Sequence, residues 1–467
     1  MSKTEKNVVE KFAQFAVELE FKDLPKETVQ MAKNLVLDTV GCSIGGHNGE
    51  CIRMVRRLVK SLGGKEECTI IGEEDKTSCT NAALANGSAA RYLDFNDVYI
   101  PQTSSAHPSE PCIPSALAVG EREHRSGEEV ITAIVAGYDI EMRITDAPKK
   151  EYIQELGYSV GKSELTAAVV AGKVLGLNEE QMVNAMSIAG LSIGVPGIQQ
   201  SYFRGGTNMM KNISGGLACS RGIVSALLAK EGCEAGSRIF EGNKGFCDWV
   251  GGCDLDALYG GFGKKFRINE TWIKPYPSNY SIHTSIEATI NLVKKHRLLA
   301  DEVREVNVRT FFRPTMLAMP QHYKPTTIEQ AEFSVPFCLA LAIRDGKVIP
   351  AQVTHDSIRD TKILALAAKI KVNLDPEMDK IKRTSTLRPA AVEIVTKDGK
   401  KYEERLDCPK GNYPQRPFPQ DELEEKYRML ASTLFQEKQI KETISSINRL
   451  EKIKDISSLM ELYAKKK

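Results

Sequence analysis

Val303-Arg-Glu-Val-Asn-Val-Arg-Thr-Phe311 alternates apolar and polar side chains, which is the pattern of a β-strand with one buried face. Asp398-Gly399 lies between two further alternating runs and is typical of a hairpin turn. A helical pattern covers Ile328–Ile343. Additional strands are predicted at Lys369–Leu374, Ala391–Thr396 and Lys401–Leu406. Residues 267–407 are therefore predicted to form an α+β unit.

The sequence before this unit is typical of helices, because apolar residues recur at steps of three and four from about residue 5 to 260. Asn178 and Gln181 have the spacing of a capping box that opens a helix. Ser214–Ala229 is rich in glycine, alanine and serine, so we expect this helix to pack closely against its neighbours.

Helices are predicted again after the α+β unit. A proline-rich stretch, residues 408–420, interrupts regular structure, and Asp421–Phe435 and Glu437–Leu450 follow with helical patterns. The predicted fold class is therefore mainly α with a smaller α+β domain. Both chain ends, residues 1–266 and 408–467, build a large helical domain, and the α+β domain of residues 267–407 is inserted between them.

Length and charge limit the classes of function. The chain has 467 residues, enough for two or three units with buried cores. Its 63 basic and 61 acidic residues leave a net charge of +2, which argues against a nucleic-acid partner and against a polybasic membrane patch. No apolar run reaches the roughly 18 residues of a membrane span, and the N-terminal residues lack an apolar core of signal-peptide length.

The eleven cysteines are an odd number without repeated Cys-x-x-Cys spacing. This favours free thiols in a reducing cytoplasm over a disulfide framework or a zinc site. Cys247 and Cys253 are six residues apart with no histidine nearby, so they do not indicate a metal site. We expect a cytoplasmic protein without a bound metal.

Lys211 precedes a glycine-rich helix start, Asn212-Ile-Ser-Gly-Gly216. The free N–H groups at the start of a helix favour anions, and a lysine there adds a full positive charge. This combination suits a carboxylate ligand. The alternative is a surface lysine without a function.

Lys274 and Tyr276 stand in Trp272-Ile-Lys-Pro-Tyr-Pro-Ser278. Two prolines push the chain toward an extended conformation, which would place the lysine and the phenol on the same side. The alternative is a rigid linker between domains, with incidental side chains. Clefts between domains are common ligand sites, so the position fits both interpretations.

Asp94, Asp97 and His107 add acid–base groups. The aspartates could equally serve as caps or turn residues. A lone histidine is more often structural, but His107 is close to the aspartates in sequence and is therefore a candidate proton carrier.

Several segments in this order carry a resemblance to a known family. They are Leu37–Gly41, Asn86–Ala90, Leu93–Asp97, His107-Pro108, Ala167–Leu177, Lys211–Gly216, Lys274–Pro277 and Ala331–Phe337. Together they resemble the MmgE/PrpD family, which includes 2-methylcitrate dehydratase, cis-aconitate decarboxylase and an iminodisuccinate epimerase. The likeness covers nearly the whole chain.

The resemblance implies a helical domain with an α+β lid, a homodimer, and chemistry on small di- or tricarboxylates without a metal or cofactor. It places the catalytic positions at Asp94, His107, Lys211 and Lys274. The lysines would bind carboxylates and stabilise the enolate-like charge that forms when a neighbouring proton is removed. Asp94 and His107 would move protons.

Three positions depart from the pattern of the family. Arg91 and Ser159 stand where histidines are common, and Val98 stands where threonine is common. Arg91 adds a guanidinium that suits a carboxylate. Arg91, Ser159 and Tyr276 are the candidate substrate-binding residues.

The leading hypothesis is a dehydratase of a small hydroxylated di- or tricarboxylate. The alternatives are an epimerase, because return of the proton to carbon needs no leaving group, a decarboxylase, and a homologue that binds a metabolite without turnover. The sequence does not identify the substrate or decide between elimination, epimerisation and decarboxylation.

Overall fold

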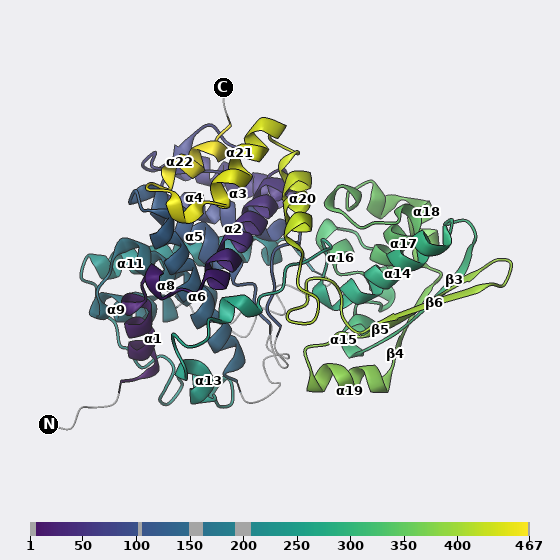
Figure 1. The fold of residues 1–467 in the computed structure, drawn as a ribbon, viewed down its shortest axis with the longest axis horizontal. Coiled ribbons are helices and arrows are strands. Elements are labelled where there is room, and N and C mark those ends of the chain that lie inside the picture. Colours follow the sequence, from purple (N-terminus) through teal and green to yellow (C-terminus); the bar gives the residue numbers. More distant parts are fainter. Residues whose placement is uncertain (1–5, 101–104, 149–161, 192–206, 466–467) are drawn as a thin grey trace.

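The computed structural model describes residues 6–100, 105–148, 162–191 and 207–465. Figure 1 shows a larger helical body beside a smaller body of helices and a sheet. The predicted fold class, mainly α with a smaller α+β part, is confirmed.

The elements of the helical body come from both ends of the chain. Its helices are α1 (Val8–Glu18), α2 (Lys26–Gly46), α3 (Glu50–Leu62), α4 (Cys79–Tyr92), α5 (Ser109–Arg122), α6 (Gly127–Asp146), α8 (Lys162–Leu175), α9 (Glu179–Gly190), α11 (Met210–Lys230), α12 (Phe246–Trp249), α13 (Leu255–Tyr259), α20 (Gln420–Ala431), α21 (Glu437–Ile447) and α22 (Ser457–Met460). A small antiparallel pair is formed by β1 (Cys68–Thr69) and β2 (Lys76–Thr77).

The α+β body lies between α13 and α20 in the chain. Its helices are α14 (His283–His296), α15 (Phe312–Met316), α16 (Ile328–Glu332), α17 (Val335–Asp345), α18 (Thr361–Ala367) and α19 (Pro376–Thr384), and its strands are β3 (Val303–Thr310), β4 (Ile370–Leu374), β5 (Ala390–Thr396) and β6 (Lys401–Leu406).

Short 3-10 helices occur along the whole chain, at η1 (Phe21–Asp23), η2 (Arg267–Glu270), η3 (Tyr280–Ile282), η4 (Pro320–Tyr323), η5 (Pro350–Gln352), η6 (Ser357–Arg359), η7 (Leu450–Lys452) and η8 (Glu461–Tyr463).

Two large hydrophobic cores underlie these bodies. The first takes side chains from Val8 to Ile273 and again from Leu423 to Tyr463. The second takes side chains from Ile282 to Ile394. The division into domains at 1–266, 267–407 and 408–467 stays a prediction, and the separate cores support it.

Small residues let α11 pack very closely against α4 and α8. A Cβ added at Gly216 would lie 2.2 Å from the Leu84 carbonyl oxygen, and one added at Gly222 would lie 2.4 Å from the Ala167 Cβ. Larger side chains on this face would push the helices apart. The close packing expected for Ser214–Ala229 is therefore confirmed.

The sheet of the α+β body has the order β4-β3-β5-β6. β3 is parallel to β4 and antiparallel to β5, and β5 is antiparallel to β6. The turn between β5 and β6 uses Gly399 at a φ of +86°, as the Asp-Gly signal predicts. α14 contacts β5 and β6, and α17 contacts β4, so these helices cover the sheet.

The helix predicted over Ile328–Ile343 is wrong in one respect, because the structure breaks it into α16 and α17. Pro336 cannot donate a hydrogen bond to the Glu332 carbonyl, and its ring would clash with that carbonyl in a continuous helix. The Ser334 hydroxyl instead accepts from the Phe337 N–H at 3.0 Å and caps the second helix. The Glu332 carbonyl accepts from the Asn279 N–H at 2.9 Å.

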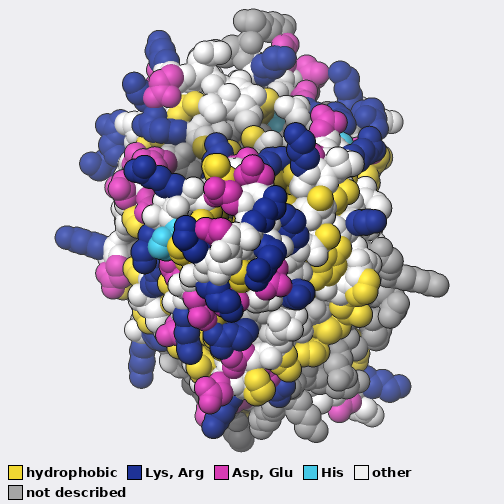
Figure 2. Space-filling model, turned by 90° about the vertical axis from the view of Figure 1, so that its right-hand side faces the viewer, with side chains coloured by type: hydrophobic (Ala, Val, Ile, Leu, Met, Phe, Trp, Pro, Cys, Tyr) yellow, Lys and Arg dark blue, Asp and Glu magenta, His cyan; other side chains and the backbone are white. Residues whose placement is uncertain are grey.

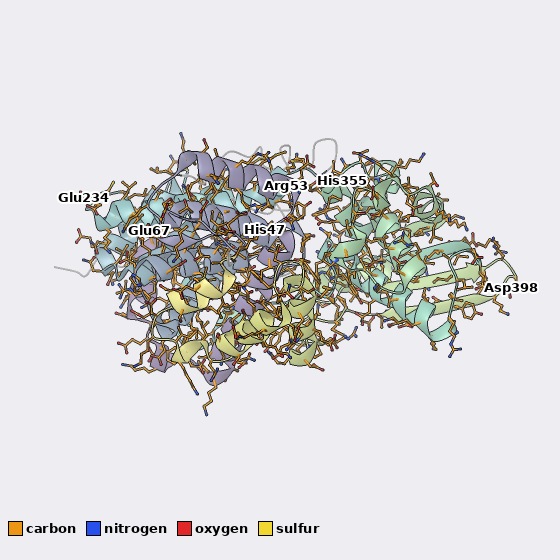
Figure 3. The ribbon with its side chains drawn as sticks, turned by 90° about the horizontal axis from the view of Figure 1, so that it is seen from above. His47, Arg53, Glu67, Glu234, His355 and Asp398 are labelled. Carbon is orange, nitrogen blue, oxygen red and sulfur yellow. The ribbon has the colours of Figure 1, made fainter. Side chains whose placement is uncertain are left out.

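The returning helix α20 packs against α2 and lies where the two bodies meet (Figure 1). On the opposite edge, His355 of the α+β body faces α3 near Arg53, and Asp398 marks the far tip of the hairpin (Figure 3). The His355 Nε2 atom lies 3.8 Å from the Glu50 Oε2 atom. Both chain ends and the inserted unit thus contribute to the junction.

Basic and acidic side chains are interspersed on the end face of the molecule, as Figure 2 shows. Within residues 6–100, 105–148, 162–191 and 207–465, no helix is long and apolar enough to cross a membrane.

Candidate active site

The Asp94 carboxylate lies at a cavity where α4, α5, α6, α8 and α11 meet the α+β body, which contributes Asn279 and Phe333 to the lining. Asp94 follows the end of α4 with a backbone φ of +46°. Few non-glycine residues adopt this left-handed conformation, aspartate more readily than most, and such positions cluster at functional sites.

Three cations surround this carboxylate. Asp94 Oδ1 lies 3.1 Å from Lys274 Nζ and 3.5 Å from Lys211 Nζ, and it accepts a hydrogen bond from Arg91 Nη1. Asp94 Oδ2 is buried and has no hydrogen-bond partner among the residues that the structure describes. Burial alone would raise the pKa of Asp94, but the charges of the three cations outweigh burial and hold this pKa well below its usual value. Asp94 is therefore ionised at neutral pH.

Lys211 is placed by the first turn of α11, as the sequence predicts. Its Nζ donates to Glu332 Oε2 at 2.9 Å and lies 5.4 Å from the centre of the Phe333 ring. Only 2% of the lysine side chain is exposed, so the alternative of a surface lysine is wrong. Because Glu332 closes α16, this hydrogen bond joins the helical body to the α+β body.

Lys274 is held by a short bridge in which the Trp272 N–H and carbonyl pair with Val98, each at 2.9 Å. The Lys274 Nζ donates to the Asp94 carbonyl at 2.9 Å and to the Ser278 carbonyl at 3.3 Å. Burial lowers the pKa of Lys274 to about 8, although the Asp94 charge acts in the opposite direction. This lysine can therefore gain or lose a proton near neutral pH.

The His107 ring lines the same cavity, and its Nδ1 lies 2.7 Å from the Asp97 carbonyl oxygen. Burial, together with the charges of Arg91 and Lys274, lowers the pKa of His107 well below its usual value. A carbonyl only accepts, so the neutral ring carries its proton on Nδ1 and a lone pair on Nε2. His107 is thus prepared to accept a proton.

The Arg91 guanidinium is buried between two protein carboxylates. Its Nε lies 2.8 Å from Glu110 Oε1, and its Nη1 donates to Asp94. Burial would lower the pKa of Arg91, but the Glu110 and Asp94 charges raise it above its usual value. Arg91 lines the cavity, and its charge is already shared by these partners. Its role in substrate binding stays a prediction.

Asp97 is hydrogen-bonded within the protein, whereas its neighbour Val98 lines the cavity. The Asp97 carboxylate accepts from Ser109 Oγ at 2.5 Å and from the Tyr138 hydroxyl at 2.8 Å, so it holds the loop in place. Burial raises the pKa of Asp97 to about 7. The Val98 side chain lines the cavity at the position where a threonine is common.

Tyr276 does not share the side of Lys274, which corrects the expectation from the sequence. The chain bends at residues 275–278 and does not continue extended, so alternation of side chains does not apply. Tyr276 lines a separate hollow with Phe95 and Lys426, and its ring lies 5.4 Å from the ring of His283. Ser159 lies outside the residues that the structure describes.

Four further charged residues belong to the site or its edge and were missed from the sequence. Glu110, Glu141 and Lys162 line the cavity, and Glu332 pairs with Lys211. Burial raises the pKa of Glu332 to about 8. Glu332 stands in Ala331–Phe337, a segment that the sequence singled out, whereas the other three are in helices with no distinguishing pattern.

Lys426, on α20, does not line the cavity but bonds to the backbone of two loops of the site. Its Nζ donates to the carbonyls of Phe95 at 2.8 Å and Lys274 at 2.9 Å, and it lies 2.6 Å from Asp38 Oδ1. The same atom lies 3.8 Å from the centre of the Phe95 ring. One buried lysine thus ties together the two loops that carry Asp94 and Lys274.

This arrangement suits an anionic ligand that exchanges protons with the site. Lys211 and Lys274 supply positive charge, and the neutral His107 supplies a base. Among the described residues, no group of three or more His, Cys, Asp or Glu side chains is placed to hold a metal ion. All eleven cysteines are free thiols.

Comparison with known proteins accounts for most of the chain. Residues 10–256 match the MmgE/PrpD N-terminal domain, and residues 276–452 match the MmgE/PrpD C-terminal domain.

Curated relatives match over almost their full length. The chain is 23% identical to a cis-aconitate decarboxylase-like protein of Aspergillus oryzae, over 99% of this chain and 98% of that protein. It is 24% identical to the cis-aconitate decarboxylase of Homo sapiens, over 98% and 94%. It is 22% identical to the 2-methylcitrate dehydratase of Escherichia coli K12, over 94% and 93%. These relatives match this chain over nearly its whole length, and their names refer to two different reactions, decarboxylation and dehydration.

Proposed function

Since this chain belongs to the MmgE/PrpD family, we propose that it is a lyase, and specifically a dehydratase of a small hydroxylated di- or tricarboxylate that resembles 2-methylcitrate. One observation carries this proposal. Lys211, Lys274 and Arg91 surround Asp94 at a cavity that also holds the neutral imidazole of His107.

The substrate binds through its carboxylates. Lys211 and Lys274 attract these carboxylates. Asp94 remains ionised between the two lysines and holds their ammonium groups in place. Because its pKa is held so low, Asp94 is a weak base, and the geometry favours an anchoring role for it over the proton transfer expected from the sequence.

His107 performs the first step. Its Nε2 lone pair takes the proton from the carbon next to a substrate carboxylate, and the electron pair of the broken C–H bond forms the carbon–carbon double bond. The C–O bond breaks, and the hydroxyl leaves as water after it takes a proton from the Lys274 ammonium group. The positive charge of Lys211 stabilises the enolate-like intermediate. Proton exchange with solvent restores His107 and Lys274.

Decarboxylation of a cis-aconitate-like acid is the second candidate. The observation in its favour is that relatives at 23–24% identity are named cis-aconitate decarboxylases or decarboxylase-like proteins, while the dehydratase relatives are at 22%. In that reaction a carboxylate leaves as carbon dioxide, and the carbon that it leaves takes up a proton.

NMR in D₂O tests both candidates. The protein is incubated separately with citrate, 2-methylcitrate, cis-aconitate, malate and iminodisuccinate, and deuterium uptake and products are followed. We expect elimination from a hydroxylated acid. Loss of carbon dioxide would replace the first candidate by the second, and deuterium uptake with inversion alone would indicate an epimerase.

Lys274→Met is the decisive variant, because it removes both a charge that binds a substrate carboxylate and the proton donor for the leaving hydroxyl. We expect its rate to fall by about 10²–10³-fold. Lys173→Met is the matched control, since Lys173 donates to the Val17 and Leu19 carbonyls at 2.8 and 2.6 Å away from the cavity. Full turnover in Lys274→Met would refute the assignment. Ligand binding without turnover in the unaltered protein would indicate a metabolite-binding protein.

A further inference from the structure

Glu141 and Lys162 form a second polar region of the cavity that the proposed reaction does not use. Glu141 comes from α6 and Lys162 is the first residue of α8, and both line the cavity together with Lys211 and Lys274. Their exposed fractions are 1% and 8%, so neither is a surface residue that happens to lie near the opening. Buried charges of this kind require partners.

Lys162 is firmly held by the protein. Its Nζ donates to the Ser105 carbonyl at 2.9 Å and to the Thr145 hydroxyl at 2.9 Å. Burial lowers the pKa of Lys162 to about 8, and the Glu141 charge opposes this shift. Two of the three N–H bonds of this ammonium group are therefore committed to protein oxygens, and the group stays in one place.

Glu141 is only partly satisfied. Its Oε2 is buried and has no hydrogen-bond partner among the residues that the structure describes. The Thr166 hydroxyl interacts with the carboxyl group and lowers its pKa, but the proton of that hydroxyl goes to the Lys162 carbonyl at 2.8 Å. Burial raises the pKa of Glu141 to about 7, while the Lys162 charge lowers it. A buried carboxylate oxygen without a donor is costly, so its presence at a cavity wall indicates that a ligand supplies the donor.

The missing donor restricts the ligand. Ionised carboxylates only accept hydrogen bonds, so they cannot satisfy Glu141 and are repelled by its charge. A hydroxyl, amino or imino group on the carbon chain of the ligand can donate to Glu141 Oε2. The ligand's carboxylates would remain with Lys211 and Lys274.

We propose that Glu141, whose charge is offset by Lys162, recognises a hydrogen-bond donor on the ligand, and that the substrate is therefore a hydroxy- or amino-polycarboxylate and not an acid without such a group. This inference rests on the proposed function, because it assumes a polycarboxylate in the cavity. It favours the dehydratase over decarboxylation of an acid such as cis-aconitate, which has no donor on its carbon chain.

Pairs of acids that differ by one hydroxyl provide the test. Citrate and tricarballylate form one pair, and malate and succinate form the other. Isothermal titration calorimetry slightly above neutral pH, where Glu141 is mostly ionised, gives the ratio of affinities within each pair. We expect the hydroxylated acid to bind about tenfold more tightly or better, as for a hydrogen bond to a charged acceptor.

Glu141→Met keeps the length of the side chain and removes the acceptor, so the affinity ratio should fall to near one. Glu141→Gln keeps one oxygen acceptor and should retain part of the preference. Asp139→Asn is the control on the same helix, since Asp139 is buried against Arg143 and does not line the cavity. Its ratio should equal that of the unaltered protein. Thermal unfolding shows that each variant is folded.

Equal binding of both acids by the unaltered protein would overturn the inference and leave the proposed function standing. An undiminished preference in Glu141→Met would also overturn it. If Glu141→Met does not fold, the affinity ratio of Glu141→Gln takes its place. A ratio in Glu141→Gln equal to that of the unaltered protein would overturn the inference. Failure of all four acids to bind the unaltered protein would refute the proposed function and this inference together.

Discussion

Single residues decide the chemistry of the cavity through burial and neighbouring charge. Asp94 and Glu141 are both buried carboxyl groups at the same cavity, yet their pKa values shift in opposite directions. Three cations next to Asp94 lower its pKa, whereas burial dominates at Glu141 and raises its pKa to about 7. The same residue type therefore serves as a fixed charge in one place and as a titratable group in another.

Lys274 makes the activity sensitive to alkaline pH. With a pKa of about 8, its ammonium form prevails below that pH and is lost above it. We expect kcat/KM to fall as the pH rises through about 8, because both carboxylate binding and proton donation need the ammonium form. Measurement of kcat/KM from neutral pH to pH about 10 checks this limb.

Lys274→Arg is the matched variant for the pH profile, because arginine stays charged in this range. Its residual activity should lack the alkaline limb. An unchanged limb in Lys274→Arg would assign the titration to another group, of which Lys162 is the nearest candidate.

His107→Asn should remove the base with little change in the surrounding loop. The asparagine amide can donate to the Asp97 carbonyl, as His107 Nδ1 does at 2.7 Å, but it has no counterpart of the Nε2 lone pair. We expect kcat to fall by about 10²–10⁴-fold with a nearly unchanged KM. Steady-state kinetics checks this, and a large rise in KM alone would show that His107 binds substrate and does not carry the proton.

At the scale of elements, the close contact between α11 and α4 restricts which side chains fit at Gly216. Gly216 on α11 faces the Leu84 carbonyl of α4, so a methyl group there would require the helices to separate. We expect Gly216→Ala to lower the free energy of unfolding by about 1–3 kcal/mol. Urea unfolding measures the change.

Gly236→Ala is the matched control, because a Cβ at Gly236 has no atom within 4 Å. This variant should be neutral or slightly stabilised, by up to about 1 kcal/mol. Equal effects of the two substitutions would mean that α11 and α4 are not packed as closely as the structure indicates.

The break between α16 and α17 illustrates how an element serves the site. Pro336 ends the continuous helix that periodicity predicts, and Glu332 closes the first half. The side chain of Glu332 then meets Lys211, which is 121 positions away in sequence. Periodicity detects both halves because each has an apolar face, but it does not detect their separation.

At the scale of the whole molecule, Lys426 connects the chain's last third to the site. Lys426→Met would leave Asp38 buried without its cation and would free the Phe95 and Lys274 carbonyls. We expect a loss of about 3–5 kcal/mol in the free energy of unfolding, as for a broken buried ion pair, together with a lower kcat. Chemical unfolding and steady-state kinetics measure the two effects.

The double variant Lys426→Met with Asp38→Asn separates stability from positioning. Removing the Asp38 charge should restore much of the stability, while kcat should stay low because the two carbonyls still lack their donor. Full recovery of activity in the double variant would show that Lys426 serves only to neutralise Asp38.

The sequence determined the local features of this protein. The strand alternation at Val303–Thr310, the Asp398-Gly399 hairpin and the Asn178 capping box were all predictable, because each depends on residues a few positions apart. The motif that contains Lys211 and the segment that contains Lys274 were also recognisable. These features place the candidate residues on helices and loops.

Only the tertiary structure decided how those residues combine. Glu141 and Lys162 lie in ordinary helical patterns, and their charge becomes significant only because folding buries both at one cavity. Tyr276 was expected beside Lys274, but the bend at residues 275–278 turns it away. The distance between charges remote in sequence, and the loss of water around them, exist only in the folded chain. These two quantities set the pKa values and therefore the chemistry.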